Sequence, residues 1–412
     1  MTVDRESFIK SKFREFYESS SSRIEAPPSI EMREFGFLLF KGKVMVRHKG
    51  FRDVESLRSF LRGIVPLHAY YSAAYYVAPE EPMERKGWVG ADLYFDIDAD
   101  HIPTPCRKLH DVWVCRGCGF KGRGAHPDKC PICGRQSFTE KTWPCEVCLE
   151  AARRETIKLV DILSEDFGLS QSEIKVSFSG HRGYHVKVER EEMKGLDSTA
   201  RKEIADYVTG TGLDAKFHGL EATEGGAGPL AGPHLGDSGW RGRIARGVYD
   251  FLLKADRESL ERIGLRRNVV EAILENREAV VRSWDSGGPW GLIRGVGLQS
   301  WKLIIKKGVE AQAAKIDTVV TTDIHRLIRL ENTLHGKTGL LKVAFPTDEI
   351  EVFDPFKSAV AFKRGEVTVF IEEAPEFRIG EEVFGPFRDE KVELPLSAAL
   401  LLLCKGMAEV TQ

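Results

Sequence analysis

The chain has 412 residues, of which 42% are hydrophobic and 30% charged, a composition typical of a folded protein with two or three structural units. Its 60 basic and 62 acidic residues give a net charge of −2, which excludes a histone-like wrapping protein but not an enzyme whose positive charge is confined to one cleft. No apolar run reaches the roughly 20 residues needed to span a bilayer, and the N-terminal residues lack a signal-peptide layout. We therefore expect a cytoplasmic protein without membrane contact.

The first half of the chain alternates helical and strand-like patterns. Apolar residues recur at helical spacing in some segments and at a period of two in others, around turns such as Lys41–Lys43. We expect helices at 1–20, 54–64 and about 150–167, and strands at 35–39, 44–46, 93–99, 174–178 and 183–188.

The second half starts with a segment, at about 192–310, that we interpret as a mostly helical insertion. Helical patterns lie at 248–254 and 269–284, and the Gly/Pro-rich residues within 219–243 predict a long exposed loop. Trp240, Arg241 and Arg243 in this loop are weak candidates for DNA contacts. Strand-like sequence resumes at Ile316 and at 367–372, and the apolar run 398–404 predicts a buried helix turn or strand that contains Cys404.

Three carboxylates alternate with apolar residues at 93–100. Side chains two residues apart share a face of a strand, so Asp96, Asp98 and Asp100 point away from the apolar side. Carboxylates about 6–7 Å apart at the backbone can share a pair of Mg²⁺ or Mn²⁺ ions. The alternative is a polar edge strand with solvated acids. The cysteine cluster that follows favours the metal site, with Asp98 as the partner of Asp96.

The sequence SGHRGYH at 179–185 predicts a tight turn between two strands, because Gly180 and Gly183 permit positive φ. A hydroxyl, a guanidinium and imidazoles around exposed backbone N–H groups suit a polyphosphate. The alternative is an ordinary hairpin whose polar tip faces water. The candidate ligands are Ser179, His181, Arg182 and His185.

A third polar segment runs from Ile316 to Gly339. Thr321 or Thr322 can cap a helix with an apolar stripe at 324–328, on which Arg326 and Arg329 lie near the same side. The GKT at 336–338 does not form a P-loop, because the first Gly of that motif is replaced by Glu331. The segment is therefore a basic, Gly-flanked loop beside another strand carboxylate, Asp317, unless its arginines merely form a solvated face.

Seven of the eight cysteines lie between Cys106 and Cys148, a clustering that indicates metal binding in a reducing compartment rather than disulfides. Two C-x₂-C pairs separated by 11 residues predict a structural zinc ribbon with ligands Cys115, Cys118, Cys130 and Cys133. A second set is Cys106, His110, Cys145 and Cys148. The pairing could cross over, His101 or His126 could replace His110, and an iron–sulfur cluster is the minority alternative.

The FDID at 95–98, the SGHRGYH at 179–185 and the Asp317 segment with its LHGKTG at 334–339 occur in an order that resembles the catalytic subunit of archaeo-eukaryotic DNA primases. The chain is most similar to the archaeal small subunit, over most of residues 15–345. The resemblance implies an α/β primase core with a zinc knuckle and a helical subdomain. It also implies that the Cys₃His set corresponds to the zinc knuckle of the family. The ribbon would then be inserted between the two halves of the knuckle, and the chain would hold two zinc ions.

The resemblance further implies synthesis of short RNA, and possibly DNA, primers on single-stranded DNA from NTPs or dNTPs by two-metal nucleotidyl transfer in replication. A large primase subunit would be the heterodimer partner. The catalytic aspartates carry over as Asp96, Asp98 and Asp317. The triphosphate contacts carry over as Ser179, Arg182, His185, Arg329, His335 and Lys337, with Arg47 as a weaker candidate. His181 stands where some relatives have Arg.

The fold class that we expect is mixed α/β: a primase–polymerase core at 1–100, 151–191 and 311–395, a zinc module at 101–150, a helical subdomain at 192–310 and a tail at 396–412. Two other functions stay open. One is a primer-extending repair or gap-filling polymerase of the same superfamily. The other is a non-catalytic zinc-ribbon subunit that binds nucleic acid, against which the triphosphate-binding loops count.

Overall fold

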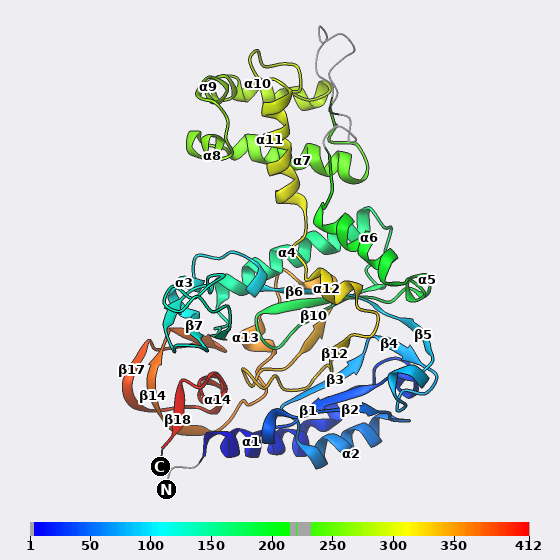
Figure 1. The fold of residues 1–412 in the computed structure, drawn as a ribbon, viewed down its shortest axis with the longest axis vertical. Helices are drawn as coiled ribbons and strands as arrows, with labels where there is room; N and C mark the ends of the chain where they lie inside the picture. The colour runs from blue at the N-terminus through cyan, green and yellow to red at the C-terminus, as the bar shows by residue number, and fades with distance from the viewer. Residues whose placement is uncertain (1–3, 215–219, 221–231, 412) are drawn as a thin grey trace. The chain divides into compact units, whose positions relative to one another are not determined.

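The computed structural model describes residues 4–214, 220 and 232–411 and has the mixed α/β fold expected from the sequence. It divides into two compact units (Figure 1). Unit 1 consists of Met1–Ile157, Ser170–Lys202 and Ile316–Gln412, and unit 2 consists of Lys158–Leu169 and Glu203–Lys315. None of the described helices combines the length and the apolar character that a membrane-spanning segment requires.

The first sheet of unit 1 contains the predicted N-terminal hairpin. Its antiparallel strand order is β12 (Leu327–Arg329), β3 (His68–Ser72), β1 (Phe35–Leu38), β2 (Met45–Lys49). Helices α1 (Arg5–Ser20) and α2 (Val54–Ile64) lie side by side against it (Figure 1). Asp53 starts α2 by accepting a hydrogen bond from a backbone N–H of the first turn. The ring of Phe60 then packs 5.0 Å from that of Phe37 on β1.

The second sheet carries two of the three predicted sequence motifs. Its antiparallel order is β13 (Val343–Phe345), β10 (Ile174–Phe178), β11 (Gly183–Val188), β6 (Leu93–Asp98). Phe95, Ile97 and Val176 are completely buried, which accounts for their alternation with polar residues along the strands. The strands at 93–98, 174–178 and 183–188 are therefore confirmed.

The C-terminal residues add a third sheet, of order β17 (Phe387–Pro395), β14 (Glu366–Ala374), β18 (Ala408–Val410). The apolar run 398–404 is helical and belongs to α14 (Leu396–Lys405), whose leucines are buried against this sheet. Cys404 is only partly buried. The remaining elements of unit 1 are β4 (Ala74–Tyr76) paired with β5 (Trp88–Ala91), β15 (Phe377–Ile379) paired with β16 (Glu382–Phe384), and the short helices α5 (Glu191–Lys194), α12 (Thr318–Thr322) and α13 (Pro355–Ser358).

The cysteine-rich residues form a separate small sheet of order β8 (Lys121–Arg123), β7 (Val112–Cys115), β9 (Phe138–Lys141). The short helix α3 (Arg107–His110) precedes the sheet, and α4 (Glu146–Glu165) follows it. Helix α4 begins four residues before the predicted start. Trp113 packs flat over Gly122, where any Cβ would come within 2.3 Å of the indole ring.

Unit 2 is helical, as the sequence predicts for most of its residues. Its helices include α7 (Gly239–Lys254), α8 (Arg257–Arg262), α9 (Arg267–Glu275), α10 (Arg277–Arg282) and α11 (Leu298–Gln312), and the end of α6 (Ser198–Thr209) also belongs to it. The single helix predicted at 269–284 is broken at Asn276. Helices α7 and α11 touch at Gly247 and Gly308, where a Cβ on Gly247 would lie 2.3 Å from the Gly308 carbonyl oxygen.

The predicted exposed loop at 219–243 is wrong at its C-terminal end, while much of the rest lies outside the described residues. Trp240 and Arg243 belong to α7 and are 3% exposed. The Arg243 guanidinium is ion-paired with Asp166 at 2.6 Å, and Arg241 pairs with Asp237 at 3.1 Å. The Gly-rich composition of the segment concealed this helix start, and a buried, paired Arg243 cannot be a DNA contact.

The segment after Ile316 also differs from the prediction. No strand begins there: Asp317 caps α12 by accepting a hydrogen bond from Val319 N. The helix predicted from Thr321 onward is wrong too, because 327–329 form strand β12, paired with 70–72 of β3. Arg326 and Arg329 therefore do not share a helix face. Periodicity within the segment could not reveal a pairing with a strand that is about 250 residues distant.

The contact between α7 and α11 yields a first testable prediction. Gly247→Val should lower the free energy of unfolding by about 1–3 kcal/mol, because the side chain has no room against the Gly308 backbone. The measurement is urea denaturation followed by circular dichroism. Gly63→Ala in α2 is the matched control, since nothing lies within 4 Å of its Cβ position, and it should be neutral or slightly stabilising. Equal effects of both substitutions would contradict the packing argument.

Candidate active site and zinc clusters

The carboxylates of Asp96 and Asp98 lie on the polar face of β6, as the alternation predicts. Asp100 lies in the turn after the strand. His185 of β11 is directly opposite Asp96 in the antiparallel ladder, and its Nε2 is 3.5 Å from Asp96 Oδ1. Asp98 accepts a hydrogen bond from Asp100 N with one oxygen, at 2.9 Å. The strand register therefore brings an imidazole from the second motif to the acids of the first.

Asp317 joins this pair through the backbone rather than by a strand of its own. Its N–H donates to the Asp96 carbonyl oxygen at 2.8 Å, and its side chain caps α12 with one oxygen. Burial raises the pKa of Asp96 to about 7, and the charges of Asp98 and Asp317 add to the rise. Burial also raises the pKa of Asp98, against the opposing charges of nearby cations. The three carboxylates thus share one electrostatic environment.

Divalent cations fit this donor set, because a nearby positive charge stabilises the ionised form of a carboxylate, such as Asp96, whose pKa neighbouring carboxylates raise. Within the described residues, only the two cysteine-rich groups bring three or more ligand atoms within 4.8 Å of one another. The aspartates therefore form an open site and not a closed cage for one ion. That arrangement is compatible with ions that also take ligands from a substrate.

The predicted turn is present, and its two glycines permit a close approach on both sides. Gly183 lies against β6, where a Cβ would come within 2.1 Å of the Ile97 carbonyl oxygen. Gly180 has a φ of +84° and faces His335. Thr338 Oγ1 donates to the Gly180 carbonyl oxygen at 2.6 Å. The loop at 335–339 is therefore docked directly on the turn, which brings the second and third motifs together.

Three buried imidazoles meet at this contact. The rings of His181 and His335 stack with centroids 5.1 Å apart, and His68 of β3 meets His335 edge-on at 4.9 Å. Burial, reinforced by nearby cations, holds the pKa of each ring well below its usual value. Neutral rings can accept hydrogen bonds, and Lys337 N donates to His335 Nδ1 at 3.1 Å while Gly336 N donates to His68 Nδ1 at 3.2 Å.

Cations surround these imidazoles. Arg329 donates to His68 Nδ1 at 2.6 Å, and Lys405 Nζ lies 2.7 Å from His181 Nε2. Burial lowers the pKa of Lys405 to about 7, and the charges of neighbouring cations contribute to the shift. In the described part of the chain, Arg329, Lys337 and Lys405 form no ion pair with a carboxylate. An anion that reached this basic cluster would find uncompensated positive charge.

Arg182 lies in the same turn but has a different environment. Its side chain is completely buried, and its NH1 donates to both carboxylate oxygens of Asp111 at 2.9 Å and to the Trp143 carbonyl oxygen at 3.2 Å. It also forms an ion pair with Asp100. Arg182 therefore ties the turn to the cysteine-rich residues.

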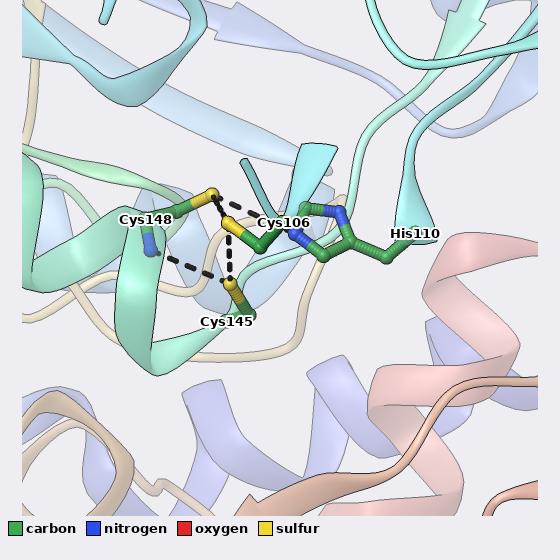
Figure 2. A group of neighbouring side chains, drawn as sticks. All are labelled: Cys106, His110, Cys145 and Cys148. Carbon is green, nitrogen blue, oxygen red and sulfur yellow. Dashed lines mark hydrogen bonds between the residues drawn. The ribbon is translucent and has the colours of Figure 1, made fainter. Parts of the chain in front are cut away.

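The first cysteine cluster adjoins this network. Cys106, His110, Cys145 and Cys148 bring their ligand atoms within 4.8 Å of one another. Figure 2 shows the three sulfur atoms and the imidazole converging, with Cys145 and Cys148 coming from the start of α4. His110 Nδ1 lies 2.8 Å from Asp111 Oδ1, which is the carboxylate–histidine arrangement that orients a metal ligand. The donor set suits a metal such as zinc.

The second cluster is the predicted ribbon of Cys115, Cys118, Cys130 and Cys133, whose sulfur atoms also lie within 4.8 Å of one another. Cys118 and Cys133 are exposed, whereas Cys115 and Cys130 are buried. Backbone N–H groups in the C-x₂-C turn contact the sulfur of Cys115. Four thiolates with this geometry also suit zinc. The cysteine grouping that the sequence favoured is therefore the one found, with neither His101 nor His126 in either cluster.

Two further predicted residues, Ser179 and Arg47, are bonded to local partners. Ser179 is buried and its Oγ accepts a hydrogen bond from His181 N within the turn. Arg47 on β2 donates to the buried Glu34 carboxylate at 2.9 and 3.2 Å. The sequence analysis missed His68, Lys405 and Asp111, because none belongs to a motif and their proximity depends on the fold.

The comparisons with known proteins agree with this geometry. A family model described as DNA primase small subunit matches residues 135–346. The chain is 35% identical to the DNA primase small subunit PriS of Methanothrix thermoacetophila, over 98% of each chain. The chain belongs to the DNA primase small subunit family. It is 34% identical to the same subunit of Cenarchaeum symbiosum and of Archaeoglobus fulgidus, over 97% of each chain in both cases.

As a primase small subunit, the chain is a nucleotidyltransferase that synthesises primers in DNA replication. The expected fold class, enzyme class and family are therefore confirmed, and the two cysteine-rich groups can bind metals such as zinc. The match to the family model ends before Lys405 and begins after the ribbon cysteines Cys115–Cys133.

The network around Asp111 yields a second prediction. Arg182→Ala should lower the free energy of unfolding by about 3–5 kcal/mol, because it removes one partner of a buried ion pair. Zinc should also be retained less tightly at the first cluster, since Asp111 orients His110. Thermal denaturation and a zinc-release assay with a colorimetric chelator measure the two effects. Arg190→Ala, whose ion pairs are partly exposed, is the control and should cost less than about 1 kcal/mol. Unchanged stability of the Arg182 variant would contradict the argument.

The raised pKa of Asp96 yields a third prediction. Asp96→Asn should raise the melting temperature at pH 8 without added Mg²⁺ or Mn²⁺. At that pH the folded wild type holds Asp96 as an ionised carboxylate, which its surroundings disfavour, and the variant lacks this charge. The gain should shrink as the pH falls from 8 to 5, since the wild-type carboxyl becomes protonated in the fold before it does in the unfolded chain. Mn²⁺ should stabilise the wild type more than the variant. The exposed Asp348→Asn is the control; a pH-independent gain would contradict the assignment.

Proposed function

We propose that this primase subunit joins nucleotides on a single-stranded DNA template, taking NTPs and possibly dNTPs, at the site formed by β6, the 179–185 turn and the 335–339 loop. The observation that carries the proposal is the juxtaposition of two opposite charges. Burial and the charges of Asp98 and Asp317 raise the pKa of Asp96. Beside these three acids lies a basic cluster without carboxylate partners, and the charges of Lys337 and Lys405 from this cluster oppose the rise in the pKa of Asp98. A nucleoside triphosphate with divalent cations has the complementary charge pattern.

Mg²⁺ or Mn²⁺ held by Asp96, Asp98 and Asp317 would supply charge neutralisation for a primer 3′-OH and for the departing pyrophosphate. The chain's own contribution is to hold the three carboxylates at fixed positions. Asp96 and Asp98 are fixed by the β6–β11 register, and Asp317 is fixed by its N–H bond to the Asp96 carbonyl oxygen. His185, whose pKa burial keeps well below its usual value, adds a neutral ring beside Asp96.

The triphosphate would be bound by Arg329, Lys337 and Lys405, with hydrogen-bonding groups from Ser179 and His335. The neutral imidazoles orient these cations, because each accepts a hydrogen bond from the cationic side chain or loop beside it. Preorganised cations of this kind stabilise the charge of the transferring phosphates without further rearrangement. Arg182 is left out of this set, since its guanidinium is bonded to Asp111. Arg47 is left out as well, because it is bonded to Glu34.

The other parts of the proposal concern metals and partners. Both cysteine-rich groups would hold Zn²⁺ with four protein ligands each, which leaves no open position for catalysis. The relatives are named as small subunits, which supports a large primase subunit as the partner of this chain. A replication enzyme of this kind would act in the cytoplasm, at the nucleoid.

The decisive experiment measures incorporation of labelled nucleotides on unprimed single-stranded DNA, with rNTPs and dNTPs in separate reactions and with Mg²⁺ or Mn²⁺. Asp98→Ala should reduce incorporation by at least about 10³-fold, because it removes a ligand of the reacting centre. The exposed Asp348→Ala is the control and should retain full activity.

A Lys405→Met variant tests the basic cluster in the same assay. It should raise the KM for the nucleotide about tenfold, the effect of losing one charge-assisted hydrogen bond, while zinc content stays unchanged. Full activity of the Asp98 variant would refute the carboxylate assignment. Activity of the wild type only on a primed template would instead indicate an extension polymerase.

A further inference from the structure

The ribbon residues 112–141 carry their charges asymmetrically. They contain six Lys or Arg residues and two Asp or Glu residues, in a chain whose net charge is −2. Four thiolates on a zinc ion would themselves contribute a charge of −2. The Lys and Arg side chains can therefore attract an anion only where they lie away from the cysteines. The strand register shows where they lie.

Residues that are paired across a sheet share a face, and so do residues two apart along one strand. Val112 is paired with Arg123 on one side and with Lys141 on the other, and Val114 is paired with Lys121 and Thr139. These side chains therefore form one face of the β8–β7–β9 sheet. Arg116 extends the same face, because its Nε donates to Thr139 Oγ1 at 3.0 Å. We call Arg116, Lys121, Arg123 and Lys141 the cationic face.

The opposite face carries the aromatic residues and the one acidic residue of these three strands. Trp113 is paired with Gly122 and Glu140, and Cys115 is paired with Phe138. The Trp113 ring packs edge-on against Phe138 at 5.3 Å. The pleat therefore separates Glu140 and the cysteine sulfur from the cationic face. No carboxylate of β7, β8 or β9 lies among the four cations.

The cationic face is accessible in the described structure. Arg116, Lys121, Arg123 and Lys141 are all exposed. Arg123 alone among them has a carboxylate partner in the described residues, Glu373 at 3.0 Å, in a pair that is itself exposed. Beside Arg123 and Val112 the face adjoins a hollow of about 310 Å³, whose other lining residues are mostly apolar, with Arg388 and Glu373 among them. Arg116, Lys121 and Lys141 do not line this hollow, and the partly buried Val112 and Val114 lie between them.

We propose that the cationic face binds the phosphate backbone of the single-stranded template. Charge complementarity selects a polyanion, because Arg116, Lys121 and Lys141 are exposed and have no carboxylate partner in the described residues. The absence of aromatic side chains on this face predicts contacts to phosphates rather than to bases, and therefore binding without sequence preference. One part of this inference rests on the proposed function, namely that the polyanion is the DNA template.

The test compares two triple variants of the full chain. Arg116→Ala, Lys121→Ala and Lys141→Ala remove the unpaired cations of the face. The control variant carries Arg14→Ala, Arg52→Ala and Lys175→Ala, which remove the same charge elsewhere on the protein. These three residues are exposed and form no ion pair in the described part of the chain. Binding of fluorescein-labelled oligothymidylate is measured by anisotropy at several NaCl concentrations. Zinc content and the melting curve of each variant show whether the ribbon is still folded.

The face variant should bind oligothymidylate at least about tenfold more weakly at 0.1 M NaCl. The slope of log K against log salt should fall by about 2, at about 0.7 for each lost phosphate contact. The control variant should change neither quantity by comparable amounts. An unchanged slope in a face variant that keeps its zinc would overturn the proposal, and so would an equal loss in the control.

A catalytic readout separates this inference from the proposed function. At saturating template, the face variant should synthesise primers at the wild-type kcat with a raised KM for template, because it does not contact the nucleotide site. A loss of kcat with unchanged template affinity would overturn the inference. Failure of the wild type to incorporate nucleotides would count against the proposed function alone, since oligothymidylate binding is measured independently.

Discussion

The Asp111 carboxylate is the constraint on which the rest of the catalytic unit depends. It is 2% exposed and accepts hydrogen bonds from the Arg182 guanidinium, from Arg107 and from Trp143 N, while it lies against His110. One buried anion thus joins the glycine turn at 179–185 to His110 of the first cysteine cluster and to the segment that leads into α4. A buried charge is tolerated only when it is fully paired, so these elements must assemble together.

The candidate active site contains two groups of like charges, the three aspartates and the basic cluster, and each group is electrostatically unfavourable. Burial and the charges of Asp98 and Asp317 raise the pKa of Asp96, while across the turn burial and the charges of Arg182 and Lys337 lower the pKa of Lys405. The histidines between them stay neutral because burial lowers their pKa. Each of these two halves of the site, the acids and the cations, stabilises the fold less than apolar residues in the same place would. Opposite charge brought to either half would reduce its electrostatic cost.

The errors of the sequence analysis have a common physical origin. Residues 316–329 resemble a strand followed by an amphipathic helix, but Asp317 caps a short helix and 327–329 pair with β3. The glycine-rich start of α7 looks like a loop, but Arg243 is stabilised there by Asp166. In both cases the decisive partner is distant in the sequence. Local periodicity carries no information about such a partner, and tertiary contacts override it.

The sequence by itself determined the strand that carries Asp96 and Asp98, the glycine turn and the membership of both cysteine clusters, because each depends on spacing within a few residues or on ligand chemistry. Only the tertiary structure decided that Arg182 is bonded to Asp111 rather than free for a ligand, and that His68 and Lys405 join the basic cluster. It also decided that the ribbon's cations share one face. Those outcomes depend on strand register and on packing between distant segments, which set the charge, burial and direction of a side chain after its identity is known.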